Sequence, residues 1–258
     1  MARILSISSL VPRGRVGNSI AVPVLEAMGH EVWSLPTILL SARPGLGTIA
    51  KHEMPAELIA EFVETYEADG VLPTIDGILS GYLPSAGHVE AVASAIRSVK
   101  SANPAAIYLC DPVMGDGDRG LYIAEDAAEG IRAQLLDQAD VLTPNLFELE
   151  WLADQTSDDP ADLAASLPPE TVVVTSSSEA DDIENILVTG EEATAWRGER
   201  LPGIPNGTGD LFAALLLGHL LNGDQPPSAF RKTCDQLQSA ARASSGCDVL
   251  QIAGFANT

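Results

Sequence analysis

The chain has 258 residues, and its 46% of hydrophobic residues is enough for the packed core of one large α/β domain. Lys and Arg number 14 against 36 Asp and Glu, so the net charge of −22 argues against nucleic acid or an anionic membrane as the main partner. Three cysteines without C-x-x-C spacing indicate neither a disulfide framework nor a zinc site, and with no apolar run long enough to span a bilayer we expect a cytoplasmic protein.

Short β-rich runs alternate with helical stretches along the chain, which favours a largely parallel sheet covered by helices. The predicted strands are residues 4–8, 31–35, 77–80, 106–110, 141–142, 171–175, 183–189 and 193–198. The predicted helices are residues 18–28, 55–67, 85–102, 125–138, 146–153, 160–167, 209–222 and 227–245. The last two strands predict an antiparallel hairpin at one edge of the sheet. Because no internal repeat or linker is evident, residues 1–258 are expected to form a single doubly wound domain.

Ligands of doubly wound folds bind at the carboxyl ends of the strands, so the loops that follow the strands should hold the site. Asp111 and Asp116 come after predicted strand 106–110, which indicates metal or cation handling. The alternative is that Asp111 only initiates a turn and Asp116 is a solvated loop charge. Residues 41–55 and 115–120 are rich in Gly, Pro and charge and are expected to be mobile loops that could close over a ligand.

Polar groups also follow the next two predicted strands. After strand 141–142 come Thr143, Asn145 and Glu148. Asn145 is placed to cap the following helix, and Glu148 is either a functional carboxylate or only a charge in the first helical turn. The next strand is followed by hydroxyls in a run that reaches Ser178. Such runs are common in loops, so it is the recurrence of functional groups at several strand ends that favours a ligand site.

The turn at residues 205–210 opens directly onto an apolar run of helical length. Gly207 and Gly209 let the backbone present bare N–H groups, and the start of a helix adds more donors, so the turn predicts an anion site. Asp210 would repel an anion unless it has a chemical task there, such as accepting a proton from an attacking alcohol. The alternative is that Asp210 only favours the first helical turn. Because no Walker A pattern occurs, ATP would be held without a P-loop lysine.

Together these motifs resemble the pyridoxal kinases of the ribokinase superfamily. The similarity rests on residues 207–210, 111–116, 143–148, 80–82 and 17–19, and it extends over nearly the whole chain. It implies a ribokinase-like α/β fold with a doubly wound, mostly parallel sheet. It also implies ATP-dependent phosphorylation of the 5′-hydroxymethyl group of pyridoxal in vitamin B6 salvage, with pyridoxine and pyridoxamine as further candidate substrates. Mg²⁺ would accompany ATP, and the protein would be a homodimer.

The resemblance also implies roles for individual residues. Asp210 would be the catalytic base, and the amides from Gly207 through Thr208 to Gly209 would form the anion hole for the transferred phosphoryl group. The residues expected to hold the vitamer are Ser9, Val16, Tyr82 and Asp210. Those expected to contact ATP are Asp116, Tyr122, Asn145, Thr175, Ser176 and Thr208. Glu148 would act on magnesium through water, and the positions that in some members surround a monovalent cation are Asp111, Thr143 and Thr175.

The sequence departs from this family on the loop expected to cover the substrate. Many members have Ser-Asn-His-Thr where this chain has residues 41–44, with Arg43 and Pro44 in place of His and Thr, and Arg13 replaces a Tyr in the first loop. Pro44 cannot supply a hydroxyl, and Arg43 brings a permanent charge. Vitamer preference therefore stays open.

Two other functions are considered. Hydroxymethylpyrimidine kinases usually read Gly-Thr-Gly-Cys where this chain has Asp210 after Gly209, which disfavours that activity. A non-catalytic carrier or sensor of B6 compounds would have no need of a base, so the presence of Asp210 together with three further carboxylates argues against it.

Overall fold

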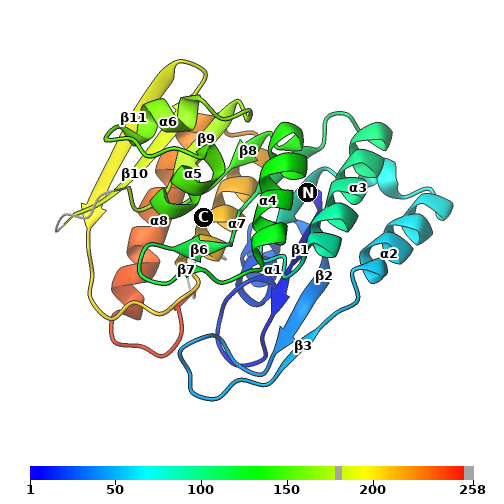
Figure 1. Ribbon diagram of the computed structural model, residues 1–258, viewed down its shortest axis with the longest axis horizontal. Coiled ribbons are helices and arrows are strands. Elements are labelled where there is room, and N and C mark those ends of the chain that lie inside the picture. Colours follow the sequence, from blue (N-terminus) through cyan, green and yellow to red (C-terminus); the bar gives the residue numbers. More distant parts are fainter. Residues whose placement is uncertain (178–181, 253–258) are drawn as a thin grey trace.

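The computed structural model describes residues 1–177 and 182–252 (Figure 1). In this part of the chain the centre is a nine-stranded sheet, ordered β11-β10-β9-β8-β5-β4-β1-β2-β3. The strands are β1 (Arg3–Leu10), β2 (Glu31–Leu40), β3 (Lys51–Glu53), β4 (Gly77–Ser80), β5 (Ile107–Cys110), β8 (Val141–Leu142), β9 (Thr171–Val174), β10 (Asp182–Thr189) and β11 (Glu192–Glu199).

The six strands from β9 to β2 are parallel, and the strands at both edges are antiparallel. The inner strands are buried along their whole length, as in β4 and β9, because helices cover both faces of the sheet. The expected α/β fold and the hairpin formed by β10 and β11 are therefore confirmed.

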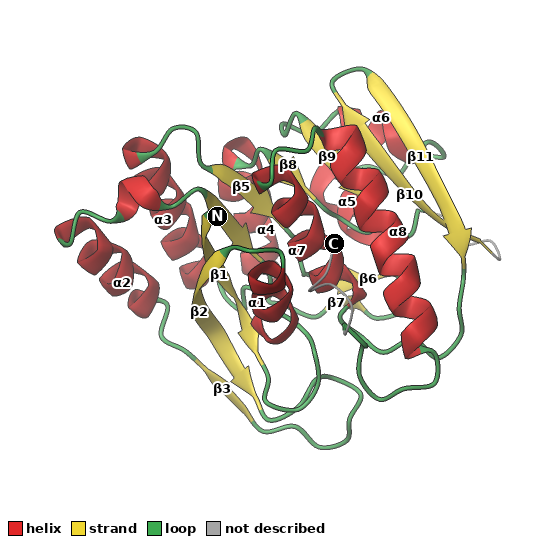
Figure 2. Ribbon diagram, turned by 180° about the vertical axis from the view of Figure 1, so that it is seen from behind, coloured by secondary structure: helices red, strands yellow, loops and turns green. Residues whose placement is uncertain are grey.

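Helices cover the sheet on both faces. One face carries α1 (Asn18–Ala27), α7 (Thr208–Leu221) and α8 (Pro226–Ser244), which lie in front of the sheet in Figure 2. The other face carries α2 (Glu57–Ala68), α3 (Ala86–Ala102), α4 (Glu125–Gly130), α5 (Leu146–Ala153) and α6 (Pro160–Ala165). Among the described residues, no helix combines the length and the apolar character that a membrane crossing requires.

Helix α7 is the most deeply buried helix of the site. Every residue from Leu211 to His219 is buried, because α7 packs against the sheet on one side and against α1 and α8 on the others. A helix that is apolar all round is stable only in such a setting. Burial of each Leu or Phe side chain contributes roughly 1.5–3 kcal/mol to the stability of the fold. A shift of α7 along its axis would expose some of these side chains, so their burial determines where the helix starts. It starts directly after Gly207, whose positive φ of 110° turns the chain into the helix.

Some elements differ from the expectation. Predicted helix 125–138 is divided into α4, a π-helix (Ile131–Leu135) and a 3₁₀ turn (Leu136–Gln138), although its apolar residues still face the core. Strand β2 continues to Leu40 instead of ending at residue 35. Pro36 lies next to an irregularity in the β1–β2 register, where the missing N–H of proline is tolerated.

The two segments expected to be mobile loops contain short paired strands. Strand β3 lies within residues 41–55 and pairs with the end of β2. Strands β6 (Gly115–Asp116) and β7 (Gly120–Leu121) form a separate two-stranded sheet, so residues 115–120 are the body of a small hairpin. These short strands were not predicted, because segments of two or three residues carry no alternation that could reveal them. Their proposed movement over a ligand stays a prediction.

Candidate active site

The carboxyl ends of β5, β8 and β9 bring three expected residues to one edge of the sheet. Asp111 follows β5 and Thr143 follows β8, and the hydroxyl of Thr143 donates a hydrogen bond of 3.0 Å to Asp111 Oδ1. Thr175 follows β9 and forms an isolated parallel bridge with Asn145. Its backbone N–H donates to the Pro144 carbonyl at 2.8 Å. The strand-end groups therefore lie in one continuous row, as predicted.

Glu148 links two of these strand ends. It forms a capping box with Asn145: the N–H of Asn145 donates to Glu148 Oε2, and the N–H of Glu148 donates to Asn145 Oδ1, both at 2.9 Å. Glu148 Oε1 also accepts the N–H of Met114 at 3.0 Å, from the loop after β5. Burial raises the pKa of Glu148 to about 7 despite these donors. Asn145 thus caps α5 as predicted, and Glu148 ties the loop after β5 to the start of α5.

Asp210 lies in the first turn of α7, beside the loop that connects β1 to α1. Burial raises the pKa of Asp210 to about 6, against the hydrogen bonds from the N–H groups of Gly17 and of Asp210 itself, which lower the pKa. Gly17 has φ 53°, and a Cβ there would collide with the hydroxyl of Ser9. Ser9 at the end of β1 is therefore held within contact distance of the residue that donates to Asp210.

The two glycines of the turn before α7 have different surroundings. A Cβ on Gly207 would collide with the carbonyl oxygen of Arg15, so the first loop presses directly on the turn. A Cβ on Gly209 would meet nothing within 4 Å. The backbone at Gly209 therefore borders open space at the start of a helix, where N–H donors have no partners within the helix. An anion can approach there, as the turn predicts.

A small cavity of about 10 Å³ separates Asp111 from Asp210. Its lining residues are Ser8, Gly17, Ala21, Leu79, Gly81, Asp111, Asp210 and Ala213. A volume of this size holds about one water molecule, so the cavity is too small for a substrate. Any substrate must therefore bind outside it, above the residues that line it. Burial first, and then the charges of Asp210 and Glu148, hold the pKa of Asp111 well above its usual range. The site therefore concentrates negative charge in a buried place.

Besides Asp210, the residues expected to hold the vitamer lie at the end of β1, in the loop between β1 and α1, and directly after β4. Ser9 and Val16 are buried, and Tyr82 is partly buried. The N–H of Tyr82 donates to the hydroxyl of Ser8 at 3.2 Å, and its carbonyl accepts the hydroxyl of Thr37 at 2.7 Å. Burial raises the pKa of Tyr82, so its hydroxyl stays protonated at neutral pH.

The residues expected to contact ATP lie on the other side of Asp111. Asp116 closes the β6–β7 turn by accepting the N–H of Arg119 at 2.9 Å, and Tyr122 follows β7 with 42% of its surface exposed. Asn145 ties this hairpin to β8, because its side-chain amide donates to the Gly115 carbonyl at 2.9 Å. Ser176 has a positive φ of 53°, and its N–H donates to Asn185 Oδ1. The end of the predicted hydroxyl run, Ser178, lies outside the described residues.

The described residues contain no group of three His, Cys, Asp or Glu side chains that could hold a metal ion by themselves. Magnesium usually keeps several waters and takes one or two carboxylates together with phosphate oxygens. The charges of Asp210 and Glu148 raise the cost of ionising Asp111, so a cation beside Asp111 would relieve this repulsion. This donor set suits an ion that arrives with a nucleotide better than a permanently bound one.

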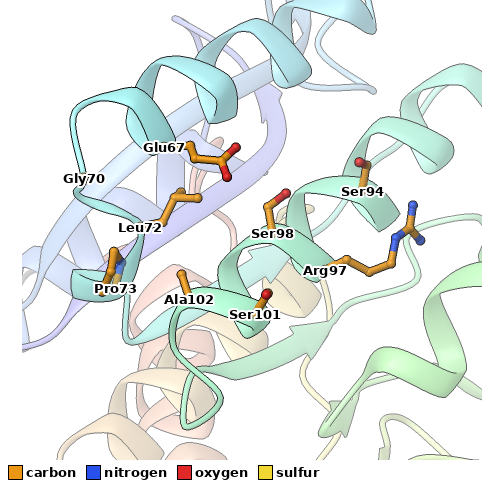
Figure 3. Close-up of a pocket in the computed structure, with 9 residues that line it drawn as sticks. All are labelled: Glu67, Gly70, Leu72, Pro73, Ser94, Arg97, Ser98, Ser101 and Ala102. Carbon is orange, nitrogen blue, oxygen red and sulfur yellow. The ribbon is translucent and has the colours of Figure 1, made fainter.

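One hollow of the described surface lies away from this site. It has a volume of about 470 Å³ between the ends of α2 and α3 and the 3₁₀ turn Leu72–Thr74, and Figure 3 shows Glu67 and Ser98 facing each other across it. The 3₁₀ turn and the end of α3 lead into the amino ends of β4 and β5. The hollow is therefore at the opposite edge of the sheet from Asp111.

A model of the phosphomethylpyrimidine kinase family matches residues 24–254. Pyridoxal kinase PdxY of Deinococcus radiodurans is 42% identical over 234 residues, which cover 84% of this chain and 78% of the relative. The chain belongs to the pyridoxal kinase family. Among solved structures similar to this family member is the pyridoxal kinase from Leishmania donovani in complex with ADP and pyridoxamine, with 28% identity, a TM-score of 0.89 and coverage of 100% of this chain and 95% of that one.

A second similar structure bears the other family name. It is a putative phosphomethylpyrimidine kinase from Bacteroides thetaiotaomicron, in a crystal form with pyridoxal, with 26% identity, a TM-score of 0.85 and coverage of 94% of this chain and 88% of that one. The resemblance to the pyridoxal kinase family stated from the motifs is thereby confirmed. The roles of individual residues stay predictions.

Two residues of this family member's site were not predicted from the sequence. Ser8 lines the cavity and accepts the N–H of Tyr82, and Thr37 holds the carbonyl of the same tyrosine. Ser8 could have been found as the strand-end neighbour of Ser9. Thr37 was not singled out, because the predicted strand stopped at residue 35.

Replacing Asp111 with Asn should stabilise the ligand-free protein. The pKa of Asp111 is raised on folding, so ionisation of this carboxyl opposes folding at every pH above its unfolded pKa of about 4, and the loss grows until the folded pKa is reached. Asn keeps an oxygen that can accept from Thr143. In thermal melts at pH 8 without metal or nucleotide, we expect Asp111→Asn to melt at least about 2 °C above the parent, the shift given by ~1 kcal/mol in a protein of this size.

The same difference should shrink as the pH falls from 8 to 5, because the parent's carboxyl takes up its proton. Asp137, which is exposed, provides the matched control: Asp137→Asn should leave the melting temperature close to that of the parent at each pH. A lower melting temperature of Asp111→Asn at pH 8 would contradict the expectation.

Proposed function

We propose that the protein is an ATP-dependent kinase that phosphorylates the 5′-hydroxymethyl group of pyridoxal, with pyridoxine and pyridoxamine as related substrates, in vitamin B6 salvage. The observation that carries the proposal is Asp210, a carboxylate with a pKa of about 6 in the first turn of α7, next to a backbone turn open to an anion. The ADP and pyridoxamine bound by the similar Leishmania donovani enzyme support this choice of substrates.

Asp210 would act as the general base. Its carboxylate takes the proton of the 5′-hydroxyl as the alcohol oxygen attacks the γ-phosphorus of ATP, and the bond from that phosphorus to the β–γ bridging oxygen breaks. The N–H groups of Gly207, Thr208 and Gly209 stabilise the negative charge on the transferred phosphoryl oxygens. ADP departs, and Asp210 releases its proton to solvent. A pKa near 6 suits this task, because the carboxylate is ionised at neutral pH and still basic enough to accept a proton.

The two substrates would approach Asp210 from opposite sides. The vitamer ring would lie against Ser9 at the end of β1, Val16 in the loop before α1 and Tyr82 after β4. ATP would lie along the ends of β5, β8 and β9, in contact with Asp116, Tyr122, Asn145, Thr175, Ser176 and Thr208. The strand order β9-β8-β5-β4-β1 supports this division, since Asp111 at the end of β5 lies between the two groups.

Cations would complete the site. Mg²⁺, when bound with ATP, neutralises charge on the phosphates, and Glu148 would hold it through water. Asp111, Thr143 and Thr175 would surround a monovalent cation. The hydrogen bond from Thr143 to Asp111, and the raised cost of ionising Asp111 beside Asp210 and Glu148, support cation binding at this place.

Hydroxymethylpyrimidine phosphorylation is the second candidate activity. The family model bears that name, but the pyridoxal in the similar Bacteroides structure means that the name alone does not separate the two substrates. Asp210, in place of the usual Cys, favours pyridoxal. A carrier or sensor of B6 compounds is the third candidate, and it would not need Asp210. We further propose that residues 1–258 form one domain, that the protein is a homodimer and that it acts in the cytoplasm.

The substrate proposal is tested by supplying ATP with each B6 vitamer and with hydroxymethylpyrimidine, and by identifying the phosphorylated product by mass spectrometry. We expect pyridoxal 5′-phosphate to form and kcat/KM for pyridoxal to exceed that for hydroxymethylpyrimidine. The Asp210→Asn variant should still bind ADP while kcat falls by about 10²- to 10⁴-fold, the usual contribution of a general base.

Each of the other candidates predicts a different result. Preference for hydroxymethylpyrimidine would establish the second activity, and binding of pyridoxal without turnover would indicate a carrier. If Asp210→Asn kept its kcat and lost only about 1 kcal/mol of stability, Asp210 would be a helix-capping residue.

Activity should depend on pH through Asp210. A base must be ionised to act, so kcat/KM should be constant above pH 6 and fall about tenfold for each pH unit below it. The residual activity of Asp210→Asn should lack this acid limb. ADP affinity, measured over the same pH range, separates titration of the base from titration of the nucleotide. An acid limb retained by the Asn variant would assign it to another group.

Removal of the divalent metal should stop turnover. The chain has 14 cationic side chains against 36 acidic ones, which leaves the charge of ATP to metal ions and backbone dipoles. We expect no phosphoryl transfer in excess chelator and full recovery when Mg²⁺ is restored. Undiminished transfer in the chelator would rule out the metal assignment.

A further inference from the structure

Arg43 makes an unusual set of contacts on the loop after β2. Its side chain is largely buried, with 9% of the residue exposed. Nε and Nη2 both donate to the carbonyl of Asp248, at 3.0 and 2.7 Å, and Nη1 donates to the carbonyl of Pro44 at 3.0 Å. The ion pairs of the described residues do not include Arg43. All three hydrogen bonds therefore serve to hold main-chain segments.

The segments that Arg43 holds adjoin the turn before α7. The Pro44 carbonyl also accepts the side-chain amide of Asn206 at 3.2 Å, and Asn206 directly precedes Gly207. Arg15 adds a parallel contact, because its Nη1 donates to the carbonyl of Leu250 at 2.9 Å. We call Arg15 and Arg43, with the carbonyls of Pro44, Asp248 and Leu250, the arginine clasp.

The clasp holds the C-terminal segment, residues 247–252, beside the turn. Leu250 is fully buried, and its Cδ1 would lie 3.3 Å from a Cβ on Gly207. Residues 202–203, which lead into the turn, are held by residues 245–246, which lead into the C-terminal segment. The Gly203 carbonyl accepts the N–H of Gly246 at 3.2 Å, and the Pro202 carbonyl accepts the hydroxyl of Ser245 at 3.0 Å. Burial of α7 fixes the helix side of the turn, and these contacts fix the other side.

We propose that Arg43 is a positioning residue for phosphoryl transfer: through Pro44, Asn206 and the C-terminal segment, it holds the turn at residues 205–209 in the shape that presents its N–H groups to the phosphoryl group. The inference rests on the proposed function of that turn. Donors that stabilise a transition state must be fixed before the reaction, and a displacement of about 1 Å costs on the order of 10²-fold in rate. Arg43 therefore acts on the phosphate-binding turn and does not read the vitamer.

Arginine is suited to this task by its rigid fork. The guanidinium presents five N–H donors in one plane, and here it reaches two carbonyls with three of them. A lysine ammonium has the same charge on a flexible stem and cannot reproduce the planar pair directed at Asp248. A charge-conserving replacement thus distinguishes the geometry of the contact from its charge.

The test compares Arg43→Ala and Arg43→Lys with Arg242→Ala, which removes an exposed arginine paired only at 3.6 Å with Glu199. We expect kcat to fall by about 10²-fold in Arg43→Ala while KM for pyridoxal changes little. Added guanidinium at millimolar concentration should restore part of kcat in Arg43→Ala and not in Arg43→Lys. Arg242→Ala should match the parent.

A double-mutant cycle identifies the route. Asn206→Ala should lower kcat in the parent and have much less effect in Arg43→Ala, because both changes release the same turn. A raised KM for pyridoxal with an unchanged kcat would overturn the proposal and make Arg43 a substrate contact. Additive effects of the two changes would also overturn it.

Limited proteolysis tests the clasp without reference to activity. Arg43→Ala should be cut within residues 247–252 faster than the parent, at a temperature where both have the same circular dichroism spectrum. If the parent were inactive towards all vitamers, the proposed function would fail. Independently of activity, equal rates of proteolysis in Arg43→Ala and the parent would overturn the arginine clasp. If Arg43→Ala did not fold, Asn206→Ala and Arg43→Lys would carry the kinetic test.

Discussion

Burial of α7 is the constraint on which the site depends. Its apolar side chains face the sheet, α1 and α8, so the helix cannot shift along its axis or rotate without exposing several of them. The position of its first turn is therefore set by the core. Asp210 and the N–H groups around Gly209 lie in this first turn, so the same packing fixes their place relative to the ends of β1, β4 and β5. Precision in the site is a product of hydrophobic packing behind it.

The ionised carboxylates of the site oppose the burial that this packing imposes on them. Asp111, Glu148 and Asp210 all have raised pKa values, chiefly because they are buried, and the chain brings no Lys or Arg into hydrogen-bonding or ion-pair contact with them in the described structure. The free protein thus holds an excess of negative charge where the proposed function places a phosphate. Cations that accompany a nucleotide would offset this excess, so folding and the proposed binding make opposite demands on the same carboxylates.

How far the sequence predicted the structure depends on where each signal lies. The inner strands, the β10–β11 hairpin and the turn before α7 were predicted because apolar runs and glycines mark them locally. Strand β3 and the β6–β7 hairpin were missed because strands of two or three residues are too short to show an alternating pattern, although their partners are near in the sequence. In the site, Asp111 and Asp210 stand in recognisable motifs, but the contacts of Arg43 with Asp248 and of Arg15 with Leu250 span 205 and 235 positions. Their acceptors are main-chain carbonyls, which every residue has.

The two glycines of the turn before α7 answer to different constraints. Gly207 has a positive φ and is pressed against the carbonyl of Arg15, so its own backbone leaves no room for a side chain. Gly209 borders open space and has no such φ, so the folded chain itself would accommodate a methyl group there. If the proposed function holds, the molecule that enters this space is what would require glycine at position 209. Within three residues, one glycine would then be dictated by the protein and the other by its ligand.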